Sequence, residues 1–327
     1  MPSPHAESAL RESISAHFEL NGLSIEELHS EPSPLEFMRY VSRNTPFVVR
    51  GGASTWKATQ RWNEAYLRSA LKGQTVNVAV TPHGNADAPS FLAEHGVAVL
   101  AKPHQEDQMF DDFLTYIIQQ EQGALSSQQS EVRYAQTQND NMRGEYDCLL
   151  PDAQNDIPFA RIALQKHADA VNLWIGNSKS VTATHKDNFE NIFVQIIGRK
   201  HFVLLPPVCQ PCVNESHLMP ATYEREGHGL SLRLDDNATS VPFATWDPDH
   251  PEANSTALSR YAHPIRVSLN PGDMLYLPAM WYHKVSQSAI VGTDNFVVAI
   301  NYWYDMDFCG PLYAFASLVR ATAEGDV

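Results

Sequence analysis

Two apolar runs lie close together between Asn172 and Pro207, and they constrain the fold more than any other feature of the chain. NIFVQII and HFVLLPP are rich in the β-branched and aromatic residues that favour strands. Gly198 and Arg199 lie between them, and a short link containing glycine is typical of a tight hairpin turn. Similar runs follow: IRVSLN and MLYLP, separated by PGD, and then NFVVAINYWY. We therefore expect a mainly β body from Asp169 onward, in which the first two runs pair as a hairpin.

The first third of the chain has a mixed pattern. Ser24, with Glu27 three residues later, predicts a helix start, and a second short helix is expected from about Ser33. TPFVVRGG and TVNVAV predict strands, NEAYLRSALKG predicts a helix that ends before Gly73, and FDDFLTYIIQQEQ predicts an amphipathic helix. VRYAQTQ returns to the alternation of a strand. The expected units are residues 1–125 as packed helices and strands, 126–306 as the β body with an insert at 209–263, and 307–327 as a C-terminal helix.

Length, composition and charge exclude several classes of protein. The 327 residues are 43% hydrophobic, which is enough for a substantial core. No run approaches the roughly 18 apolar residues of a membrane helix, and the N-terminus lacks the pattern of an export signal. We therefore expect no membrane association and a cytoplasmic location, which can extend to the nucleus. The net charge of −15 argues against nucleic acid as a partner and is compatible with a basic one.

Cys209 and Cys212 form the CxxC sequence CQPC. A structural zinc site would need a second such pair, which the chain lacks. The pair follows LLPP and does not open a helix after a strand, so a redox role is disfavoured. We expect ordinary loop cysteines.

The sequence HKD places His185 and Asp187 two residues apart. On one strand, residues i and i+2 point to the same face, so both side chains can reach a common point while Lys186 points elsewhere. They would supply two legs of a 2-His-1-carboxylate triad, which leaves three positions of an octahedral Fe(II) open. His283, in LYLPAMWYHKV, is the best candidate for the third leg. The alternative is an incidental HxD in a chain with 14 histidines.

Lys200 stands 15 residues after His185, at the start of the second apolar run. An exposed hairpin lysine is the ordinary interpretation, but the neighbouring HFVLL favours burial. An unpaired ammonium is costly to bury, so an anionic partner is expected.

These features resemble the JmjC-domain 2-oxoglutarate oxygenases. The resemblance covers most of the chain and implies a double-stranded β-helix, or cupin-like jelly roll, that is extended by helices and strands. It also implies Fe(II) as the metal, with 2-oxoglutarate and O₂ as co-substrates. The blocks that carry it, in the family's order, are NTPFVVRGGASTWKA, TVNVAVTPHGNADA, RYAQTQND, THKDNFENIF, GRKHFVLLPP, MPATY, PGDMLYLPAMWYHKV and INYWYDM.

The same resemblance implies roles for individual residues. His185, Asp187 and His283 would be the Fe(II) ligands, which are the catalytic centre. Lys200 matches the family's lysine that pairs with the distal carboxylate of 2-oxoglutarate. The other co-substrate contacts that the resemblance implies are Thr182, Tyr134, Asn191 and Asn301.

Some of these contacts have ordinary alternatives. Asn191 is expected on the same strand face as His185, but an asparagine in a strand can also satisfy local backbone groups, and so can Asn301. Trp303 is expected beside the site, where a core aromatic is an equal account. Phe189 and Phe193 are expected in the barrel core.

For the reaction, the resemblance points to the protein-hydroxylase branch of the family. It implies C3 hydroxylation of a lysine in a translation-associated GTPase of the developmentally regulated GTP-binding class. Histone lysine demethylation is an alternative that the absence of a reader or zinc module disfavours. Peptidase activity on histone tails would be more natural for a zinc site, and a cupin-fold binding protein without turnover is a further alternative.

The C-terminal segment has one apolar helix face. Leu312, Phe315, Ala316 and Val319 fall at i, i+3, i+4 and i+7. This face could pack on its own barrel, or it could form a helix-mediated homodimer, which resembles how relatives in this family associate. We expect the homodimer.

Overall fold

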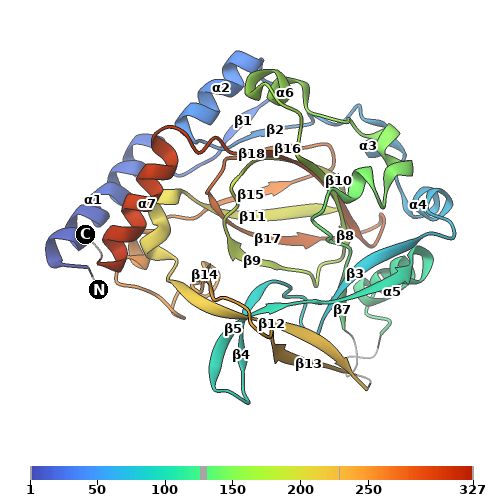
Figure 1. Ribbon diagram of the computed structural model, residues 1–327. Coiled ribbons are helices and arrows are strands. Elements are labelled where there is room, and N and C mark those ends of the chain that lie inside the picture. Colours follow the sequence, from blue (N-terminus) through green and yellow to red (C-terminus); the bar gives the residue numbers. More distant parts are fainter. Residues whose placement is uncertain (1, 126–130, 228, 326–327) are drawn as a thin grey trace.

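Two β-sheets face each other at the centre of the molecule (Figure 1). The computed structural model describes residues 2–125, 131–227 and 229–325. The larger sheet has the order β1-β2-β16-β10-β18-β8, and the smaller has the order β15-β11-β17-β9. This is a jelly roll, as the sequence predicted. The strands are Glu26–Leu28 (β1), Phe47–Val49 (β2), Met274–Leu277 (β16), Phe189–Ile197 (β10), Val297–Asp305 (β18), Ala170–Gly176 (β8), Ile265–Leu269 (β15), Arg199–Leu205 (β11), Tyr282–Ser288 (β17) and Thr182–His185 (β9).

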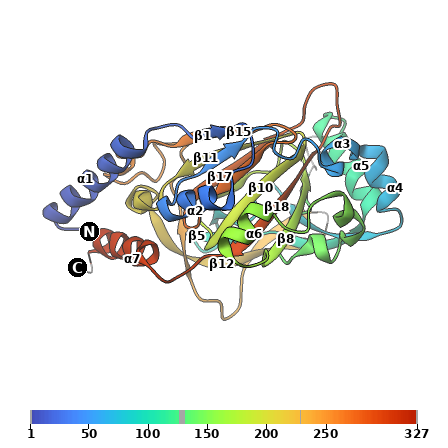
Figure 2. The ribbon, with the colours of Figure 1, turned by 90° about the horizontal axis from the view of Figure 1, so that it is seen from above.

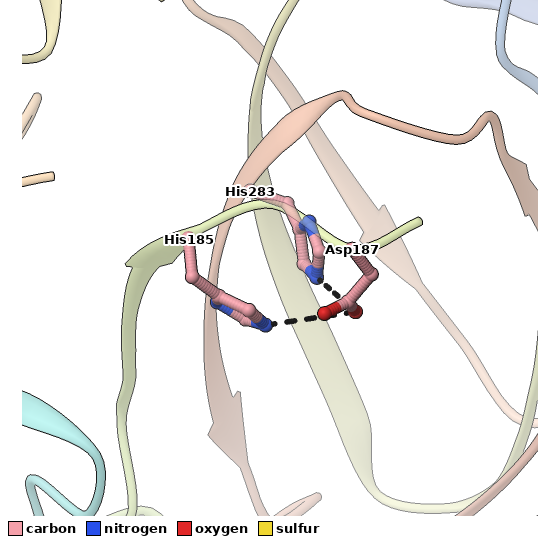
Figure 3. Close-up of side chains that lie close together, drawn as sticks. All are labelled: His185, Asp187 and His283. Atoms are coloured by element: carbon pink, nitrogen blue, oxygen red, sulfur yellow. Dashed lines mark ion pairs between the residues drawn. The ribbon is translucent and has the colours of Figure 1, made fainter. Parts of the chain in front are cut away.

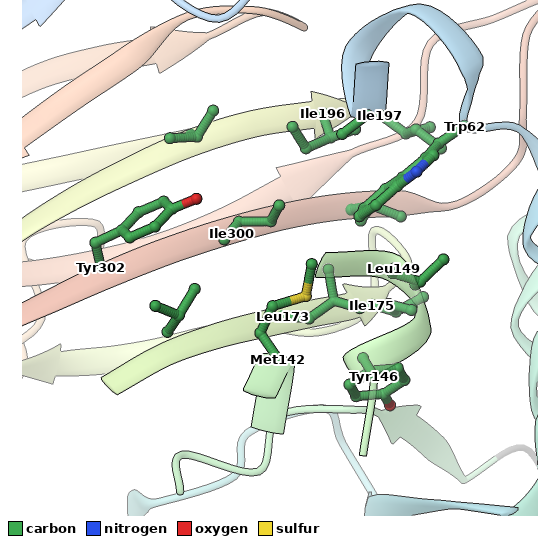
Figure 4. Close-up of a cluster of buried hydrophobic side chains, with 14 of the residues drawn as sticks. Trp62, Met142, Tyr146, Leu149, Leu173, Ile175, Ile196, Ile197, Ile300 and Tyr302 are labelled. Carbon is green, nitrogen blue, oxygen red and sulfur yellow. The ribbon is translucent and has the colours of Figure 1, made fainter. Parts of the chain in front are cut away.

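The larger sheet is buried on both faces. Along β10, Phe193 points into the space between the sheets, where its ring packs edge-on against Phe202 of β11. Val194, the next residue, points to the outer face and joins a second cluster that helices cover. Figure 4 shows part of this outer cluster, with Leu173 and Ile300 on adjacent strands. Burial on both faces explains why these strands read as continuous apolar runs instead of alternating ones.

β10 and β11 do not form the predicted hairpin. β10 pairs with β16 and β18 in the larger sheet, whereas β11 pairs with β15 and β17 in the smaller one. The glycine between them, Gly198, has a φ of 71°, and a Cβ there would approach Val297 Cγ2 to 2.8 Å. A close approach and a left-handed backbone both select glycine. The link is therefore a corner at which the chain passes from one sheet to the other.

Helices cover the two ends of the barrel. In Figure 2, α1 and α7 lie side by side at one end, and they contact each other. α3, α4 and α5 lie at the other end. The helices are Pro4–Asn21 (α1), Pro34–Arg43 (α2), Lys57–Arg61 (α3), Glu64–Ala70 (α4), Phe110–Glu121 (α5), Pro158–Leu164 (α6) and Pro311–Glu324 (α7). No helix within the described ranges is long and apolar enough to cross a membrane.

The N-terminal predictions had mixed outcomes. The helix from Ser33 is confirmed as α2, whose capping box joins Ser33 and Glu36. The helix from Ser24 is wrong, because residues 26–28 form β1, which pairs in parallel with β2. Pairing at the sheet edge overrides the weak local cap signal. Helix α1, which buries Leu10 and Ile14, was not predicted.

Two smaller sheets extend the barrel. One has the order β6-β3-β7, with strands His104–Met109 (β6), Thr75–Thr81 (β3) and Val132–Tyr134 (β7). The other has the order β13-β12-β5-β4, with β14 paired to β12; its strands are Gly229–Leu234 (β13), Glu215–Glu226 (β12), Val97–Lys102 (β5), Ala88–Leu92 (β4) and Val241–Ala244 (β14). The expected insert at 209–263 thus contributes strands β12 to β14. The division into three units stays a prediction.

Four short 3₁₀ segments complete the described structure. They are Asn141–Arg143 (η1), Asp147–Asp152 (η2), Pro207–Cys212 (η3) and Ser259–Tyr261 (η4). Cys209 and Cys212 lie in η3 and not in an irregular loop. Both thiols are free and buried in the apolar cluster beneath α1.

Candidate metal and co-substrate site

Three potential metal ligands converge between β9 and β17 (Figure 3). His185 is the last residue of β9, and it lies directly opposite His283 on β17. His185 Nε2 and His283 Nε2 each lie 3.7 Å from Asp187 Oδ2. One potential ligand atom from each residue lies within 4.8 Å of the other two. The three side chains can therefore bind one ion between them.

Asp187 does not lie on the same strand as His185, contrary to the prediction. β9 ends at His185, and the next three residues are outside any strand. The carbonyl of Asp187 instead accepts a hydrogen bond of 2.7 Å from the N–H of Met280. Met280 has a φ of 67°, an uncommon conformation for a residue that is not glycine. The loop before His283 thus holds the carboxylate against the two imidazoles.

Hydrogen bonds to the backbone set the tautomer of both histidines. His185 Nδ1 lies 2.8 Å from the carbonyl oxygen of Ala183, and His283 Nδ1 lies 3.0 Å from that of Trp281. Carbonyls only accept, so each Nδ1 must donate, and each Nε2 is left with its lone pair toward Asp187. Burial, with His185 nearby, lowers the pKa of His283 to about 4. A neutral imidazole is the form that binds metal.

Lys200 is buried beside this cluster without an anion. Its side chain is only 3% exposed, and Nζ donates to Tyr134 Oη and Gln287 Oε1, both at 3.0 Å. No carboxylate of the described chain lies within ion-pair distance of Lys200. Burial therefore lowers its pKa to about 7. The cation has neutral hydrogen-bond partners only, and an anionic ligand would complete it.

The remaining predicted residues fall in two places. Thr182, Tyr134 and Asn191 line one cavity together with the triad and Lys200. Asn191 reaches it from β10, in the other sheet, and not from the strand of His185 as predicted. Asn301 is fully buried and does not line the cavity. It contacts two lining residues: its Nδ2 donates to Asn191 Oδ1 (3.2 Å), and its Oδ1 accepts from the Trp174 indole (2.9 Å).

The aromatic residues divide in the same way. Phe193 lies in the barrel core and also lines the cavity. Phe189 is only half-buried and stacks on Trp303, with ring centroids 4.8 Å apart. Trp303 lines the cavity, and its Nε1 has no hydrogen-bond partner within the described structure. This donor is available to a bound molecule.

Sequence reasoning missed three further polar or aromatic residues of the site. Gln138 and Trp174 line the cavity, and Gln287 contacts Lys200. Gln287 had a usable signal, because it lies four residues after His283 on a strand and therefore faces the same side. Gln138 lies outside any strand and carried no such signal.

The site fits Fe(II) and a dicarboxylate. Two imidazole nitrogens and one carboxylate oxygen form the facial donor set that leaves positions open on iron. The ammonium of Lys200 and the hydroxyls of Tyr134 and Thr182 offer charge-assisted hydrogen bonds to a carboxylate deeper in the cavity. Lys200, which is buried with neutral hydrogen-bond partners only, is the observation that favours such a ligand.

Comparison with known proteins gives consistent matches. Residues 32–310 match the cupin-like domain family. The human bifunctional peptidase and (3S)-lysyl hydroxylase JMJD7 is 35% identical over 304 residues, which cover 92% of this chain and 90% of that protein. The lysine-specific demethylase JMJ32 of Arabidopsis thaliana is 34% identical over 299 residues (88% and 83%). The JmjC domain-containing protein E of Dictyostelium discoideum is 32% identical over 312 residues (90% and 87%).

Proposed function

Because this chain belongs to the cupin-like JmjC family, we propose that it is an Fe(II)- and 2-oxoglutarate-dependent lysyl hydroxylase. The substrate that we propose is a lysine, hydroxylated at C3, in a translation-associated GTPase of the developmentally regulated GTP-binding class. Family membership and the hydroxylase relative support a 2-oxoglutarate oxygenase. The lysine is supported by the human relative, which is named as a lysyl hydroxylase, and the acidity of the chain is compatible with a basic peptide.

The observation that carries the proposal is the pairing of an open triad with an uncompensated buried lysine. A metal-binding triad alone is compatible with several reactions. Lys200 adds a binding position for a carboxylate within the same cavity. A ketoacid with a second, distal carboxylate satisfies both requirements, whereas a hydrolytic metal site has no use for the lysine.

Each group has a separate task in this proposal. His185, Asp187 and His283 would hold Fe(II), and Lys200 with Tyr134 would hold the distal carboxylate of 2-oxoglutarate. Iron and 2-oxoglutarate together supply the oxidising power to insert oxygen into an unactivated C–H bond, with succinate and CO₂ as the other products. The protein would orient one C–H bond of the substrate toward the metal and exclude water from the reacting site.

The names of the relatives suggest two other activities. A demethylase would use the same site but would release a methyl group from a methylated lysine. A peptidase would cleave the backbone, and the human relative is named as a peptidase as well as a lysyl hydroxylase. The facial triad and Lys200 favour oxidation over peptide hydrolysis. A binding protein without turnover would have the same fold but would form no oxidised product.

Mass spectrometry of peptides distinguishes these activities. The full-length protein is incubated with Fe(II), 2-oxoglutarate, ascorbate and peptides that cover the lysines of candidate GTPases. We expect one lysine to gain an oxygen atom, with Asp187→Ala as the inactive control. Loss of a methyl group, cleavage of the backbone, or no change in any peptide would each contradict the proposal. Anaerobic titration with Fe(II) and 2-oxoglutarate, which should produce a charge-transfer band, tests co-substrate binding without the peptide.

We also propose that the protein is a homodimer. Ala316 and Val319 of the predicted apolar face are buried against the chain itself, whereas Phe315 is 43% exposed. Leu318 and Tyr313 are 58% and 42% exposed on the same helix. These exposed apolar groups support a contact between copies. Light scattering of the intact chain and of Leu318→Glu should give a dimeric and a monomeric mass; a monomeric intact chain would contradict the proposal.

The last component of the proposal is a cytoplasmic location, because the substrate that we propose is associated with translation. Imaging of the tagged full-length protein tests it. A purely nuclear signal would contradict it.

A further inference from the structure

The loop between β3 and β4 is fixed against the segment that leads into β9. The N–H of Val181 donates to the carbonyl of Gly84 at 2.8 Å. Gly84 has a φ of 75°, and a Cβ there would come within 1.9 Å of the Lys179 carbonyl oxygen. Only glycine permits this approach. Strand β4 also contacts β9. The residues of this loop are therefore held beside the strand that carries His185.

Asp87 is the last residue of this loop, and its carboxylate lies near the metal site. Its Oδ2 accepts a hydrogen bond of 3.3 Å from Gln136 Nε2. Gln136 stands between Tyr134 and Gln138, both of which line the cavity. Burial raises the pKa of Asp87. Asp87 directly precedes β4, which contacts β9, the strand that ends at His185, and it is not one of the three potential metal ligands.

Asp87 has no cationic partner. No ion pair to it occurs within residues 2–125, 131–227 and 229–325. Lys102 also influences its pKa, but the ammonium of Lys102 already pairs with Asp235. Elsewhere on the same side of the molecule, Arg225 pairs with both Glu106 and Glu131. A half-buried carboxylate that has only an amide donor remains incompletely compensated.

The part of the cavity lining that the structure describes offers no other free acid. Its one carboxylate is Asp187, which is a potential metal ligand. A positively charged side chain that entered the cavity would therefore need a counter-charge from outside this lining. Asp87, which accepts a hydrogen bond from Gln136 in the loop held against the segment before β9, can supply that charge.

We propose that Asp87 receives the ammonium group of the substrate lysine and thereby determines specificity for a cationic side chain. This inference rests on the proposed lysyl hydroxylation. When C3 of a lysine faces the metal, three further methylenes and the ammonium extend beyond it. A carboxylate set beside the metal, and not at it, suits a chain of this length. A neutral side chain of similar shape gains nothing from Asp87.

Kinetics with two matched peptides test this role. One peptide carries the target lysine, and the other carries norleucine, which has the same apolar stem without the ammonium. Oxidation is measured for the wild type, for Asp87→Asn and for Asp236→Asn, a control that removes an exposed aspartate in the turn between β13 and β14. Asp87→Asn keeps an oxygen that can accept from Gln136. Asp87→Glu keeps the charge and should restore part of the lysine preference.

For Asp87→Asn we expect kcat/KM for the lysine peptide to fall about ten- to a hundredfold, as when one partner of a desolvated charge pair is lost. The norleucine peptide should change little, so the preference for lysine should collapse. Asp236→Asn should keep the wild-type preference. An equal loss on both peptides would assign Asp87 a structural role and overturn the inference, as would a retained preference for lysine.

The wild type alone provides a second test that does not depend on the folding of any variant. It should prefer lysine over norleucine at least about tenfold, and an equal rate on both peptides would overturn the role of Asp87. Oxidation of neither peptide, with the charge-transfer band intact, would instead contradict the proposed lysyl hydroxylation. The two failures are therefore distinguishable.

Discussion

Two lysines flank the triad, and they differ in what neutralises them. Lys186 lies between His185 and Asp187 in the sequence and forms an ion pair with Glu215. Its Nζ also donates to Tyr282 Oη at 2.7 Å, and the same hydroxyl donates to Glu215 at 2.7 Å. Burial alone would raise the pKa of Glu215, but Lys186 holds that pKa below its ordinary value. Lys200, on the other side of the triad, contacts only Tyr134 and Gln287.

This difference separates scaffold from binding site. The Lys186 network is complete, and it ties the first residue of β12 in the insert to β17, where Tyr282 precedes His283. It needs no ligand and positions the metal ligands. Lys200 has no carboxylate partner among the described residues, so in our proposal a bound anion would complete this region. Lys186 and Lys200 both lie close to the triad, but the groups that contact them indicate a structural role for Lys186 and a ligand-binding role for Lys200.

The largest expected effect comes from the triad that both lysines border. Asp187→Ala leaves two imidazoles, which cannot hold Fe(II) and fix the co-substrate in a facial arrangement. Succinate production should become undetectable, although the fold should persist because Asp187 lies outside the strands. Enzymatic assay of succinate, with circular dichroism as the folding control, measures this. Full turnover in the variant would show that Asp187 is not needed to hold the metal, and would contradict the triad assignment.

The next effect should appear at Lys200. In Lys200→Ala, the distal carboxylate of 2-oxoglutarate would be buried without a cationic partner, which costs about 2–5 kcal/mol, or roughly a 30- to 4,000-fold rise in its KM. The apparent requirement for iron should change much less. Steady-state assays that vary each component in turn give both values. Equal changes in the two requirements would show that Lys200 is structural, like Lys186.

The converse change concerns Glu215. Glu215→Ala leaves Lys186 without its anion and should lower the free energy of unfolding by about 2 kcal/mol, which is less than for a fully buried pair because Lys186 is partly exposed. Lys200→Met should leave that free energy unchanged or raise it, because it removes an uncompensated charge. Urea unfolding without ligands compares the two variants. A larger loss in Lys200→Met would reverse the interpretation of the two regions.

The last effect, which is the smallest when it is taken per unit of pH, is a dependence on pH. Burial lowers the pKa of Lys200 to about 7, and a bound carboxylate should raise it again. Below pH 7 the lysine is already protonated, but above it the binding of 2-oxoglutarate requires proton uptake. The affinity should therefore fall as pH rises above 7, by up to about tenfold per unit. Lys200→Arg, whose guanidinium stays charged, should lack this dependence when KM is measured between pH 6.5 and 9.

The site was more predictable from the sequence than the route of the chain around it. His185, Asp187 and Lys200 carried chemical types and spacings that pointed to a metal and an anion. The reason given for the first two was nevertheless partly wrong, since Asp187 owes its position to Met280 and not to the pleat of β9. Side-chain chemistry can be read locally, whereas orientation here depends on a loop almost a hundred residues away.

The remaining misses have the same origin. The link at Gly198 has the composition of a hairpin, and only the sheets on either side distinguish it from a corner. The ion pair between Lys186 and Glu215 joins the segment that carries His185 and Asp187 to the insert. No repeating pattern in the sequence indicates that these two residues meet. Asp87 likewise lies in a loop whose position depends on Gly84 and β9. Such contacts are set by topology, which local propensity does not encode.

The corner at Gly198 also has a kinetic consequence. At this corner β10 and β11 enter different sheets. Each can complete its pairing only after a strand near the C-terminus has been made, which is β18 for β10 and β17 for β11. Strand β2, near the N-terminus, likewise pairs with β16. During synthesis the first strands of the barrel therefore emerge long before their partners, and contacts so distant in sequence slow folding. Because His283 lies on β17, the three side chains that could hold a metal can come together only after most of the chain has been made.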